Sequence, residues 1–400
     1  MAIQDDLSIA ILDILRSANL NCEIPSDLTL ERPKNRDHGD FATSIALALA
    51  KPSGKNPREI AELIKVKLEA RSDISSVEVA GPGFLNISLN SASQGDLISS
   101  ILSAGKKFGE SKTFPGTKIN LEFISANPTG PLHLGHTRWA AVGDALGRVL
   151  SAAGAEVTRE FYINDRGVQM DLFGASLQAA ALGNPRPEDG YAGDYINDLA
   201  QEIVSKYPDV LKQNGIEQQN AFRDYGYALQ LKEQQDVLVK FGTRFDVWFS
   251  EKSLYENNFF QHCQEVLKSK GHVFEQEGAI WLRTTDFGDD KDRVMLKSDG
   301  SMAYFASDSA YYISKRERGF EINIYMLGAD HHGYVGRLKA LAACNGDNPD
   351  YNVEVLIGQM VKIMEGGQEV KLSKRAGTII TLEERLVEHT SELQSLAYLV

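Results

Sequence analysis

The fold is decided by residues 119–163, which read INLEFISANPTGPLHLGHTRWAAVGDALGRVLSAAGAEVTREFYI. Ile119, Leu121 and Phe123 alternate as in a strand, and the breaker-rich SANPTGPL follows them. A helix is expected next, with Gly154 as its C-terminal cap, because apolar residues recur there with a period of 3.6: Trp139, Val142, Leu146, Val149 and Leu150. EVTREFYI reads as another strand, so the stretch predicts a βαβ unit and a parallel sheet.

A similar pattern returns late in the chain. EINIYMLG at 321–328 reads as a strand, YVGRLKALAAC at 334–344 as a helix, and VEVLI as a further strand. VKIMEGGQEVKL then predicts a hairpin that turns on Gly366-Gly367, with SKRAG as a loop beyond it. Residues at about 171–270 are largely helical and interrupt the sheet. We therefore predict a doubly wound, Rossmann-like α/β fold with a helical insertion.

Residues 1–110 are expected to form a small α+β domain. LSIAILDIL and FATSIALALA have helical spacing, another helix is expected over 57–70, and VEVA and FLNISL read as strands about a Gly-Pro-Gly turn. A linker at 112–116 leads to the Rossmann-like domain, which is expected over 117–380. A chain of 400 residues also suits two or three domains of about 150 residues each.

Composition narrows the class of protein. Hydrophobic residues make up 42% and charged residues 24%, as in soluble globular proteins rather than disordered ones. No run approaches the roughly 18 apolar residues of a membrane span, and the N-terminus has acids where a signal peptide has basic residues. Cys22, Cys263 and Cys344 match no paired zinc spacing. We expect a cytoplasmic, reduced protein without structural zinc.

The net charge of −13 argues only weakly against a nucleic-acid partner, because phosphate binding depends on local patches. Residues 31–71 contain nine basic and six acidic side chains, an excess of +3 inside an acidic chain. From charge alone, this excess favours a solvated helical face over a phosphate-binding patch.

The strongest local motif is HLGH at 133–136, where the first strand gives way to the helix. Open α/β sheets bind ligands outside the carboxyl ends of their strands. Gly135 permits a close backbone approach, and the helix N-terminus offers N–H groups to phosphates. His133 and His136 lie three residues apart and can donate hydrogen bonds to a phosphoryl group. On these four residues alone, a capping turn or part of a metal site is equally compatible.

A second motif, KLSK at 371–374, is followed by Arg375 and then Ala-Gly. Lys371, Lys374 and Arg375 form a dense positive cluster on a glycine-flanked loop, which suits nucleotide phosphates if the loop closes over them. In isolation such a string is typical of a solvated surface turn, so its weight comes from its pairing with HLGH.

Together the two motifs resemble the HIGH and KMSKS signatures with which class I aminoacyl-tRNA synthetases hold ATP. Their flanks resemble arginyl-tRNA synthetases of the bacterial type in EFISANPTGPLHLGH, GDALGRVLSAAGAEVTREFYINDRG, YFASDSAYY, YMLGADHHGYVGRLKA and VKLSKRAGTI. The motifs keep the family's order and spacing. PKNRDHGDFATSIALALAK is similar to the family's additional N-terminal domain, which contacts the tRNA elbow, and this favours phosphate binding by the basic excess.

The resemblance implies a role for each matching residue. The phosphate-binding and catalytic set is His133, Gly135, His136, Lys371, Ser373, Lys374 and Arg375, with Leu372 at the usual methionine and Arg375 at the usual final serine. The arginine-binding set is Glu122, Ser125, Asn127, Tyr304, Asp308 and His331, and Glu251 of WFSE is a further candidate. Fixed carboxylates suit a guanidinium, which cannot lose its proton. Without the resemblance, Tyr304 and Asp308 would be an ordinary pair at a helix start.

The implied cofactors are ATP and the Mg²⁺ bound to it, and the implied partners are L-arginine and tRNA(Arg), with a monomer favoured and no membrane association. The family continues into a helical C-terminal domain that binds the anticodon stem and loop. Here residues 381–400 would be its start, and they depart from the family pattern just after TLEE. The chain is therefore expected to be a fragment or a natural truncation, which would impair tRNA charging.

The leading function is thus ATP-dependent activation of L-arginine and its transfer to tRNA(Arg). One alternative is another class I nucleotidyl transferase, such as a glutamyl-type synthetase or a small cofactor adenylyltransferase. The long N-terminal domain and the SANPTG flank argue against it. The other alternative is a non-catalytic tRNA- or arginine-binding module, against which the intact HLGH and KLSK motifs argue.

Overall fold

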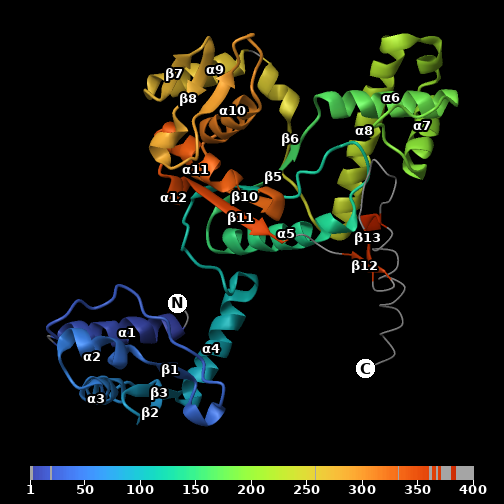
Figure 1. Ribbon diagram of the computed structural model, residues 1–400. Helices are drawn as coiled ribbons and strands as arrows, with labels where there is room; N and C mark the ends of the chain where they lie inside the picture. The colour runs from blue at the N-terminus through green and yellow to red at the C-terminus, as the bar shows by residue number, and fades with distance from the viewer. Residues whose placement is uncertain are drawn as a thin grey trace, which may run out of the picture. The chain divides into compact units, whose positions relative to one another are not determined.

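The computed structural model describes residues 3–18, 20–256, 258–331, 333–359, 363–365, 368–370 and 380–383. The chain divides into two compact units, Met1–Gly109 and Glu110–Val400, each with its own hydrophobic core (Figure 1). Among the described residues, no helix has both the length and the apolar character needed to cross a bilayer.

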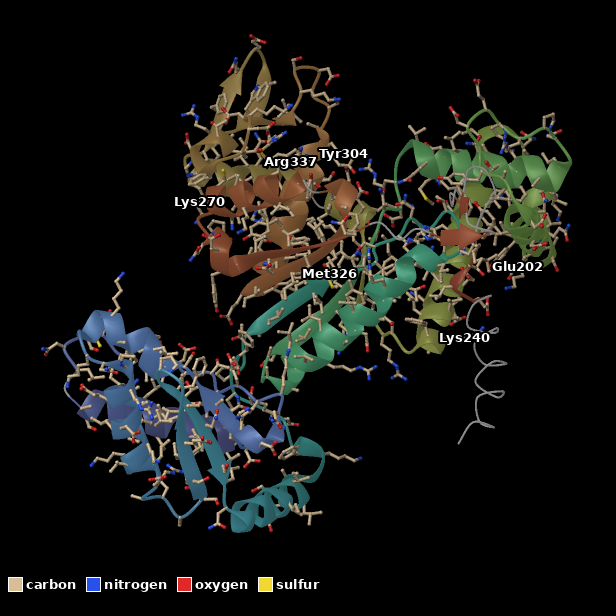
Figure 2. All side chains as sticks on the ribbon, turned by 60° about the horizontal axis from the view of Figure 1, so that its bottom comes forward. Glu202, Lys240, Lys270, Tyr304, Met326 and Arg337 are labelled. Atoms are coloured by element: carbon tan, nitrogen blue, oxygen red, sulfur yellow. The ribbon has the colours of Figure 1, made fainter. Side chains whose placement is uncertain are left out.

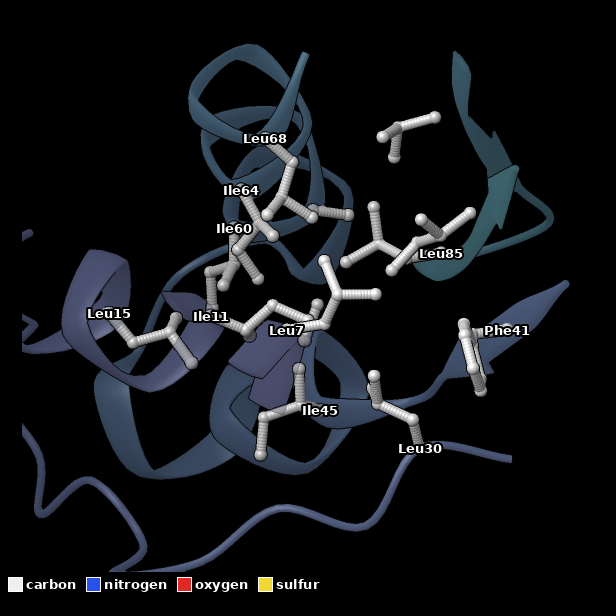
Figure 3. Packing of buried hydrophobic residues seen from close by; sticks show 14 of the residues in the cluster. Leu7, Ile11, Leu15, Leu30, Phe41, Ile45, Ile60, Ile64, Leu68 and Leu85 are labelled. Carbon is white, nitrogen blue, oxygen red and sulfur yellow. The ribbon is translucent and has the colours of Figure 1, made fainter. Parts of the chain in front are cut away.

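The first unit packs helices against a three-stranded antiparallel sheet of order β1-β3-β2. Its elements are α1 (Ile3–Ser17), β1 (Phe41–Thr43), α2 (Ile45–Ser53), α3 (Pro57–Leu68), β2 (Ile74–Ala80), β3 (Phe84–Leu89) and α4 (Ser91–Ala104). Residues four apart on two helices meet in the core, as Figure 3 shows: Leu7, Ile11 and Leu15 of α1, and Ile60, Ile64 and Leu68 of α3. Each such buried side chain stabilises the fold by about 1.5–3 kcal/mol.

The helix predicted over FATSIALALA begins later than its spacing indicates. Phe41–Thr43 is strand β1, whose Phe41 pairs with Ile87 of β3, and α2 starts only at Ile45. The Thr43 hydroxyl accepts a hydrogen bond from the N–H of Ile45 (3.2 Å), which ties the strand to the helix start. Phe41 and Thr43 are both buried, and buried residues two positions apart are typical of a strand. The sequence pattern fits a helix as well, and pairing with β3 determines that residues 41–43 form a strand.

The second unit is built on a parallel sheet of order β11-β10-β4-β5-β6. The strands are β4 (Lys118–Glu122), β5 (Glu156–Ile163), β6 (Val247–Ser250), β10 (Ile322–Gly328) and β11 (Val353–Gly358). Both predicted βαβ units are confirmed, with α5 (Thr137–Ala152) between β4 and β5 and α11 (Tyr334–Cys344) between β10 and β11. From β4, the next strands in the chain, β5 and β6, extend the sheet on one side, whereas β10 and β11 extend it on the other side. The direction in which strands are added to the sheet therefore reverses between β4 and β10.

Helices cover both faces of this sheet, which confirms the doubly wound α/β architecture (Figure 1). Ile324 and Met326 of β10 pack with residues of α5, whereas Tyr325 packs with α10 (Tyr304–Glu317) and α11. The same alternation on β4 buries its apolar residues on the α5 side. It therefore directs Asn120 and Glu122 to the opposite side, toward α10.

The helix α5 is expected from the spacing of its large apolar residues, but its fully buried residues are small. Val142 is 44% exposed and Val149 is 65% exposed, while Gly143 and Gly147 are buried. A Cβ atom at Gly143 would lie 2.3 Å from the ring of Phe123. Glycine thus lets the helix approach the sheet closely, at the strand that leads into HLGH.

A helical segment with its own core follows β5. It comprises α6 (Val168–Leu182), α7 (Asp194–Lys206) and α8 (Gly215–Phe241). The range predicted for the insertion, about 171–270, contains β6, which is an edge strand of the parallel sheet. Part of that range therefore belongs to the sheet. Four residues, all half-buried, are too few for alternation to reveal a strand.

The remaining elements flank the sheet. Helix α9 (Phe259–Ser269) precedes a small antiparallel sheet that the sequence analysis did not predict: β7 (Val273–Gln276), β8 (Ala279–Leu282) and β9 (Arg293–Leu296). The short helix α12 (Pro349–Asn352) leads into β11. The predicted hairpin is present as the antiparallel pair β12 (Ile363–Glu365) and β13 (Gln368–Val370), and its turn lies outside the described residues.

Candidate active site

A cavity of about 900 Å³ opens at the carboxyl ends of β4, β5 and β10, next to the point where strand order reverses. Open α/β sheets bind their ligands at this position. Figure 2 labels three residues of its lining: Tyr304 at the start of α10, Arg337 of α11 and Met326 of β10.

Strand register places three polar side chains in one row beside this cavity. On the parallel strands Tyr325 is the register partner of Glu122, and Glu122 is the partner of Glu160. Register partners point to the same face of a sheet, so all three side chains are directed toward α10. Tyr325 and Glu122 line the cavity, and Glu160 is completely buried next to them.

Helix α10 and its C-terminal end meet this row with residues spaced by three or four: Asp308, Tyr311, Lys315 and Arg318. The Lys315 ammonium lies 2.6 Å from Glu122 Oε2 and 3.9 Å from Glu160 Oε1. Tyr311 donates a hydrogen bond of 2.6 Å to Glu160, and Arg318 donates two. Burial alone would raise the pKa of Glu160, but the hydrogen bonds from Arg318 and the charge of Lys315 hold it below its usual value.

Asp308 is a second carboxylate of the cavity wall. Its Oδ2 atom is shielded from solvent and accepts no hydrogen bond from the described residues. Burial raises the pKa of Asp308 to about 6, and the charges of Glu251 and Glu122 act in the same direction. A hydrogen bond from Tyr334 and the charge of Arg337 oppose the increase. A buried acceptor without a partner is costly, so this oxygen suits a donor supplied by a ligand.

The turn after β4 is strained at two positions. Ile124 and Ser125 have φ values of 68° and 49°, in the left-handed region that β-branched residues such as isoleucine rarely adopt. The turn directs the Ser125 hydroxyl back to the strand end, where it donates to Glu122 Oε1 (3.2 Å) and accepts from the N–H of Tyr162 (3.2 Å). Such strain persists where the surroundings fix it, often at functional sites. Glu122 is thus held through both of its oxygens.

Glu251, the first residue after β6, adds a third carboxylate to the cavity wall. Burial raises its pKa, while the charge of Arg166 and a hydrogen bond from Tyr162 oppose this increase. The buried Asp165 holds the two residues on either side of Glu251, because it accepts hydrogen bonds from the Ser250 hydroxyl (2.5 Å) and the backbone N–H of Lys252 (3.0 Å).

His133 and His136 lie at the entry to α5. His133 Nδ1 accepts a hydrogen bond from the N–H of Gly135 (3.1 Å), and His136 Nδ1 accepts one from the N–H of His133 (3.2 Å). A neutral imidazole that accepts at Nδ1 carries its proton on Nε2 and is a donor there. The two rings are stacked with centroids 3.8 Å apart. A Cβ atom at Gly135 would lie 2.8 Å from the His133 ring, so this packing depends on glycine.

The KLSK motif lies outside the described residues, together with Arg375, but the segment that follows it is described. The N–H of Leu134 donates to the carbonyl of Ile380 (3.0 Å), and the N–H of Leu382 donates to the carbonyl of Leu132 (2.8 Å). His133 and Thr381 form the bridge between these bonds. The chain that leaves KLSK is therefore paired directly with HLGH.

The structure brings most of the predicted site residues to one cavity. Its lining includes Glu122, Ser125, Asn127, His133, His136, Glu251, Tyr304, Asp308 and His331. Gly135 supports the His133 ring beside the cavity. Lys371, Ser373, Lys374 and Arg375 lie outside the described residues. The roles of all these residues stay predictions.

The sequence analysis missed several residues of the lining, among them Tyr162, Tyr311, Tyr325 and Arg337. Strand alternation in EINIYMLG could have revealed Tyr325, which faces away from its apolar neighbours. Helical spacing from Asp308 could have revealed Tyr311. Tyr162 and Arg337 carry no comparable local signal, because tertiary packing alone brings them to the cavity.

Two family models match the chain. One, described as the arginyl tRNA synthetase N terminal domain, matches residues 2–89. The other, described as the catalytic domain of tRNA synthetases class I (R), matches residues 97–396.

Known proteins similar to the chain include a curated relative and solved structures. The arginine–tRNA ligase of Renibacterium salmoninarum is 52% identical over 389 residues, which cover 96% of this chain and 70% of that protein. A putative arginyl-tRNA synthetase from Campylobacter jejuni is 33% identical with a TM-score of 0.66, over 73% of this chain and 65% of that one. The arginyl-tRNA synthetase of Thermus thermophilus shares the fold, with a TM-score of 0.71 at 20% identity over 98% of this chain and 70% of its own.

Proposed function

Since the chain belongs to the class I arginyl-tRNA synthetase family, we propose that it uses ATP to activate L-arginine and transfers the arginyl group to tRNA(Arg). The observation that carries this proposal is the composition of the cavity. Three carboxylates, Glu122, Glu251 and Asp308, line the same space as the two histidines of HLGH. That space therefore offers acceptors for a cation and donors for phosphates.

The carboxylates form the arginine end of the site. A guanidinium is planar and permanently charged, and it donates in pairs to carboxylate oxygens. Asp308 Oδ2 has no partner among the described residues, and Glu122 is fixed by Ser125 and Lys315. Tyr304 is 82% exposed at the start of α10, and its ring can stack on the planar cation when the substrate enters.

The histidines form the phosphate end. The Nε2–H groups of His133 and His136 are donors, and the N-terminus of α5 adds backbone N–H groups and a partial positive charge. Lys371 and Lys374 would bring positive charge from the other side. The pairing of Leu134 with Ile380 supports this arrangement, because Lys374 is only six residues before Ile380 and thus within about 20 Å of HLGH.

The proposed reaction has two steps. A carboxylate oxygen of arginine attacks the α-phosphorus of ATP, and the bond to the bridging oxygen breaks, so that pyrophosphate leaves with the negative charge. A terminal ribose hydroxyl of tRNA then attacks the carbonyl carbon of the adenylate, loses its proton and releases AMP. Mg²⁺ enters as the counter-ion of ATP and needs no dedicated site in the chain. The side chains contribute positioning and stabilisation of developing charge.

We assign residues 1–110 to tRNA-elbow contact and 117–380 to catalysis, with the helices α6, α7 and α8 as an insertion in the catalytic domain. The match of residues 2–89 to the arginyl tRNA synthetase N terminal domain supports the first assignment. We also propose that the protein acts in the cytoplasm as a monomer.

Charging of tRNA(Arg) with labelled arginine tests the proposal. We expect ATP-dependent incorporation of arginine into tRNA, with none when ATP is omitted or when lysine replaces arginine. Incorporation of another amino acid, or binding of tRNA and arginine without adenylate formation, would contradict it.

A further inference from the structure

The ammonium of Lys315 is completely buried beside the cavity, where burial lowers its pKa and the charges of Glu122 and Glu160 oppose this decrease. Its side chain is 0% exposed, and the ammonium lies 4.2 Å from the ring centroid of Tyr311 and 3.9 Å from that of Tyr325. Both distances are within the range of cation–π attraction. A lysine is almost never fully buried unless it is paired, and here its partners are Glu122 at 2.6 Å and Glu160 at 3.9 Å.

Lys315 does not line the cavity, whereas Glu122 does. The two oxygens of Glu122 have different partners. Oε2 accepts from Lys315, and Oε1 accepts from the hydroxyl of Ser125, which itself lines the cavity. Glu122 therefore lies between the ammonium and the substrate space, with its carboxylate plane fixed at both ends.

We propose that Lys315 is a positioning residue for arginine recognition: it holds the Glu122 carboxylate in the orientation in which it meets the substrate guanidinium without rearrangement. This inference rests on the proposed function of the cavity. Lys315 does not touch the substrate, so its effect passes through Glu122.

Charge balance gives the physical reason. Glu122 and Asp308 place two carboxylates on the same cavity, and the charge of Glu122 contributes to the raised pKa of Asp308. The Lys315 ammonium behind Glu122 offsets part of the repulsion between the two carboxylates. The charged and titratable groups that face Lys315 or Glu122 are Glu160 and Tyr162 of β5, Tyr325 of β10, Asp308, Tyr311 and Arg318 of α10 and its end, and Tyr334 of α11. Arg318 pairs with Glu160, and Lys315 is the cation that contacts Glu122 in the part of the chain that the structure describes.

Arg316, the next residue on α10, provides a matched control. It makes a two-pronged ion pair with Asp347 (2.7 and 3.0 Å), and it does not line the cavity. Arg316→Met therefore breaks an ion pair of the same helix without changing the surroundings of Glu122. A merely structural role of Lys315 would give both substitutions the same effect.

The test is a double-mutant cycle in amino-acid activation, with Lys315→Met, Glu122→Gln and the combination of the two. We expect Lys315→Met to raise the KM for arginine about 10- to 100-fold, as for loss of a charge-assisted interaction, and to change the KM for ATP less than about twofold. In the Glu122→Gln background the same substitution should change the KM for arginine less than about threefold, because the residue through which it acts is already altered.

Three results would overturn the inference: an equal effect of Lys315→Met in both backgrounds, an unchanged KM for arginine, or an equal effect of Arg316→Met. If Lys315→Met lowers the Tm too far for assay, the double variant Lys315→Met/Glu160→Gln is used in its place. This variant removes one positive and one negative charge, so the net charge is unchanged, and Glu122 still lacks the Lys315 ammonium. Failure of the proposed function is distinguishable, because then the unmodified protein itself shows no arginine-dependent activation.

Discussion

Asp308→Asn is the substitution that probes the arginine site most sharply. It keeps the shape of the side chain and replaces one carboxylate oxygen by an amide N–H₂. In the protein, Oδ2 of Asp308 is shielded from solvent and has no partner among the described residues, so a substrate guanidinium would supply its hydrogen bond. With an amide in this position, the guanidinium meets a donor instead of an acceptor and loses the opposite charge.

The expected magnitude follows from this geometry. Removal of one side of a buried ion pair costs about 3–5 kcal/mol, which at 1.4 kcal/mol per factor of ten is a loss on the order of 10²–10³ in arginine activation. The stability of the folded protein should increase in Asp308→Asn, whereas its activity decreases. Burial raises the pKa of Asp308 from 3.8 to about 6, so the ionised carboxylate destabilises the fold by up to about 3 kcal/mol at neutral pH. Asp308→Asn should therefore raise the Tm while it lowers activity.

The assay compares kcat/KM for arginine with that for citrulline, an uncharged analogue of the same shape, in the unmodified protein and in Asp308→Asn. The arginine value should fall by the full factor and the citrulline value by far less. If the ratio of the two values is unchanged, Asp308 does not recognise the guanidinium, and Glu122 becomes the better candidate.

Four further predictions concern the phosphates, the pH dependence and the tRNA. His136→Ala should lower kcat about 10²-fold or more with little change in ATP affinity, since a preorganised donor acts mainly as charge develops; normal turnover with weakened ATP binding would assign it to the ground state. Lys374→Ala should also reduce kcat more than affinity, and ATP should slow proteolysis at 371–377 in the unmodified protein; equal cleavage with and without ATP would exclude closure over the nucleotide. Because Asp308 has a pKa of about 6, its charge is present above this pH and is lost below it, so kcat/KM for arginine should fall about tenfold per pH unit below 6; a profile that Asp308→Asn leaves unchanged would point to another group. Lys34→Gln with Lys51→Gln should weaken tRNA binding and reduce the slope of log affinity against log salt by about one per lost phosphate contact, with the KM for arginine unchanged; an unaltered slope would leave these lysines as a solvated face.

The architecture of the second unit could be predicted because its signals are local and repeated. Two strand–helix–strand patterns, each with the spacing of a buried element, specify a parallel sheet, and HLGH follows the first strand directly. The elements that escaped prediction are short or depend on tertiary pairing. Strand β1 lies inside a helical pattern until β3 pairs with it, and β6 has only four residues.

The candidate site was predictable only in part, for the same reason. Asp308, Glu122 and the two histidines stand in the motifs that carry the family resemblance, so the sequence predicts them as site residues. Lys315 does not, because its importance arises from strand register, which sets Glu122 beside Glu160, and from the helix α10 that crosses them. No spacing along the chain reveals that two residues 193 positions apart form a buried ion pair.

Arginine-dependent exchange of labelled pyrophosphate into ATP, measured with and without tRNA(Arg), tests the central claim most directly. It reports formation of the adenylate itself and needs no transfer to tRNA. If the cavity at β4, β5 and β10 activates arginine, exchange should require arginine, should not occur with lysine or glutamine, and should be about 10²-fold slower or more in His136→Ala. Exchange that depends on a different amino acid, or no exchange with arginine in the presence or absence of tRNA, would contradict the account.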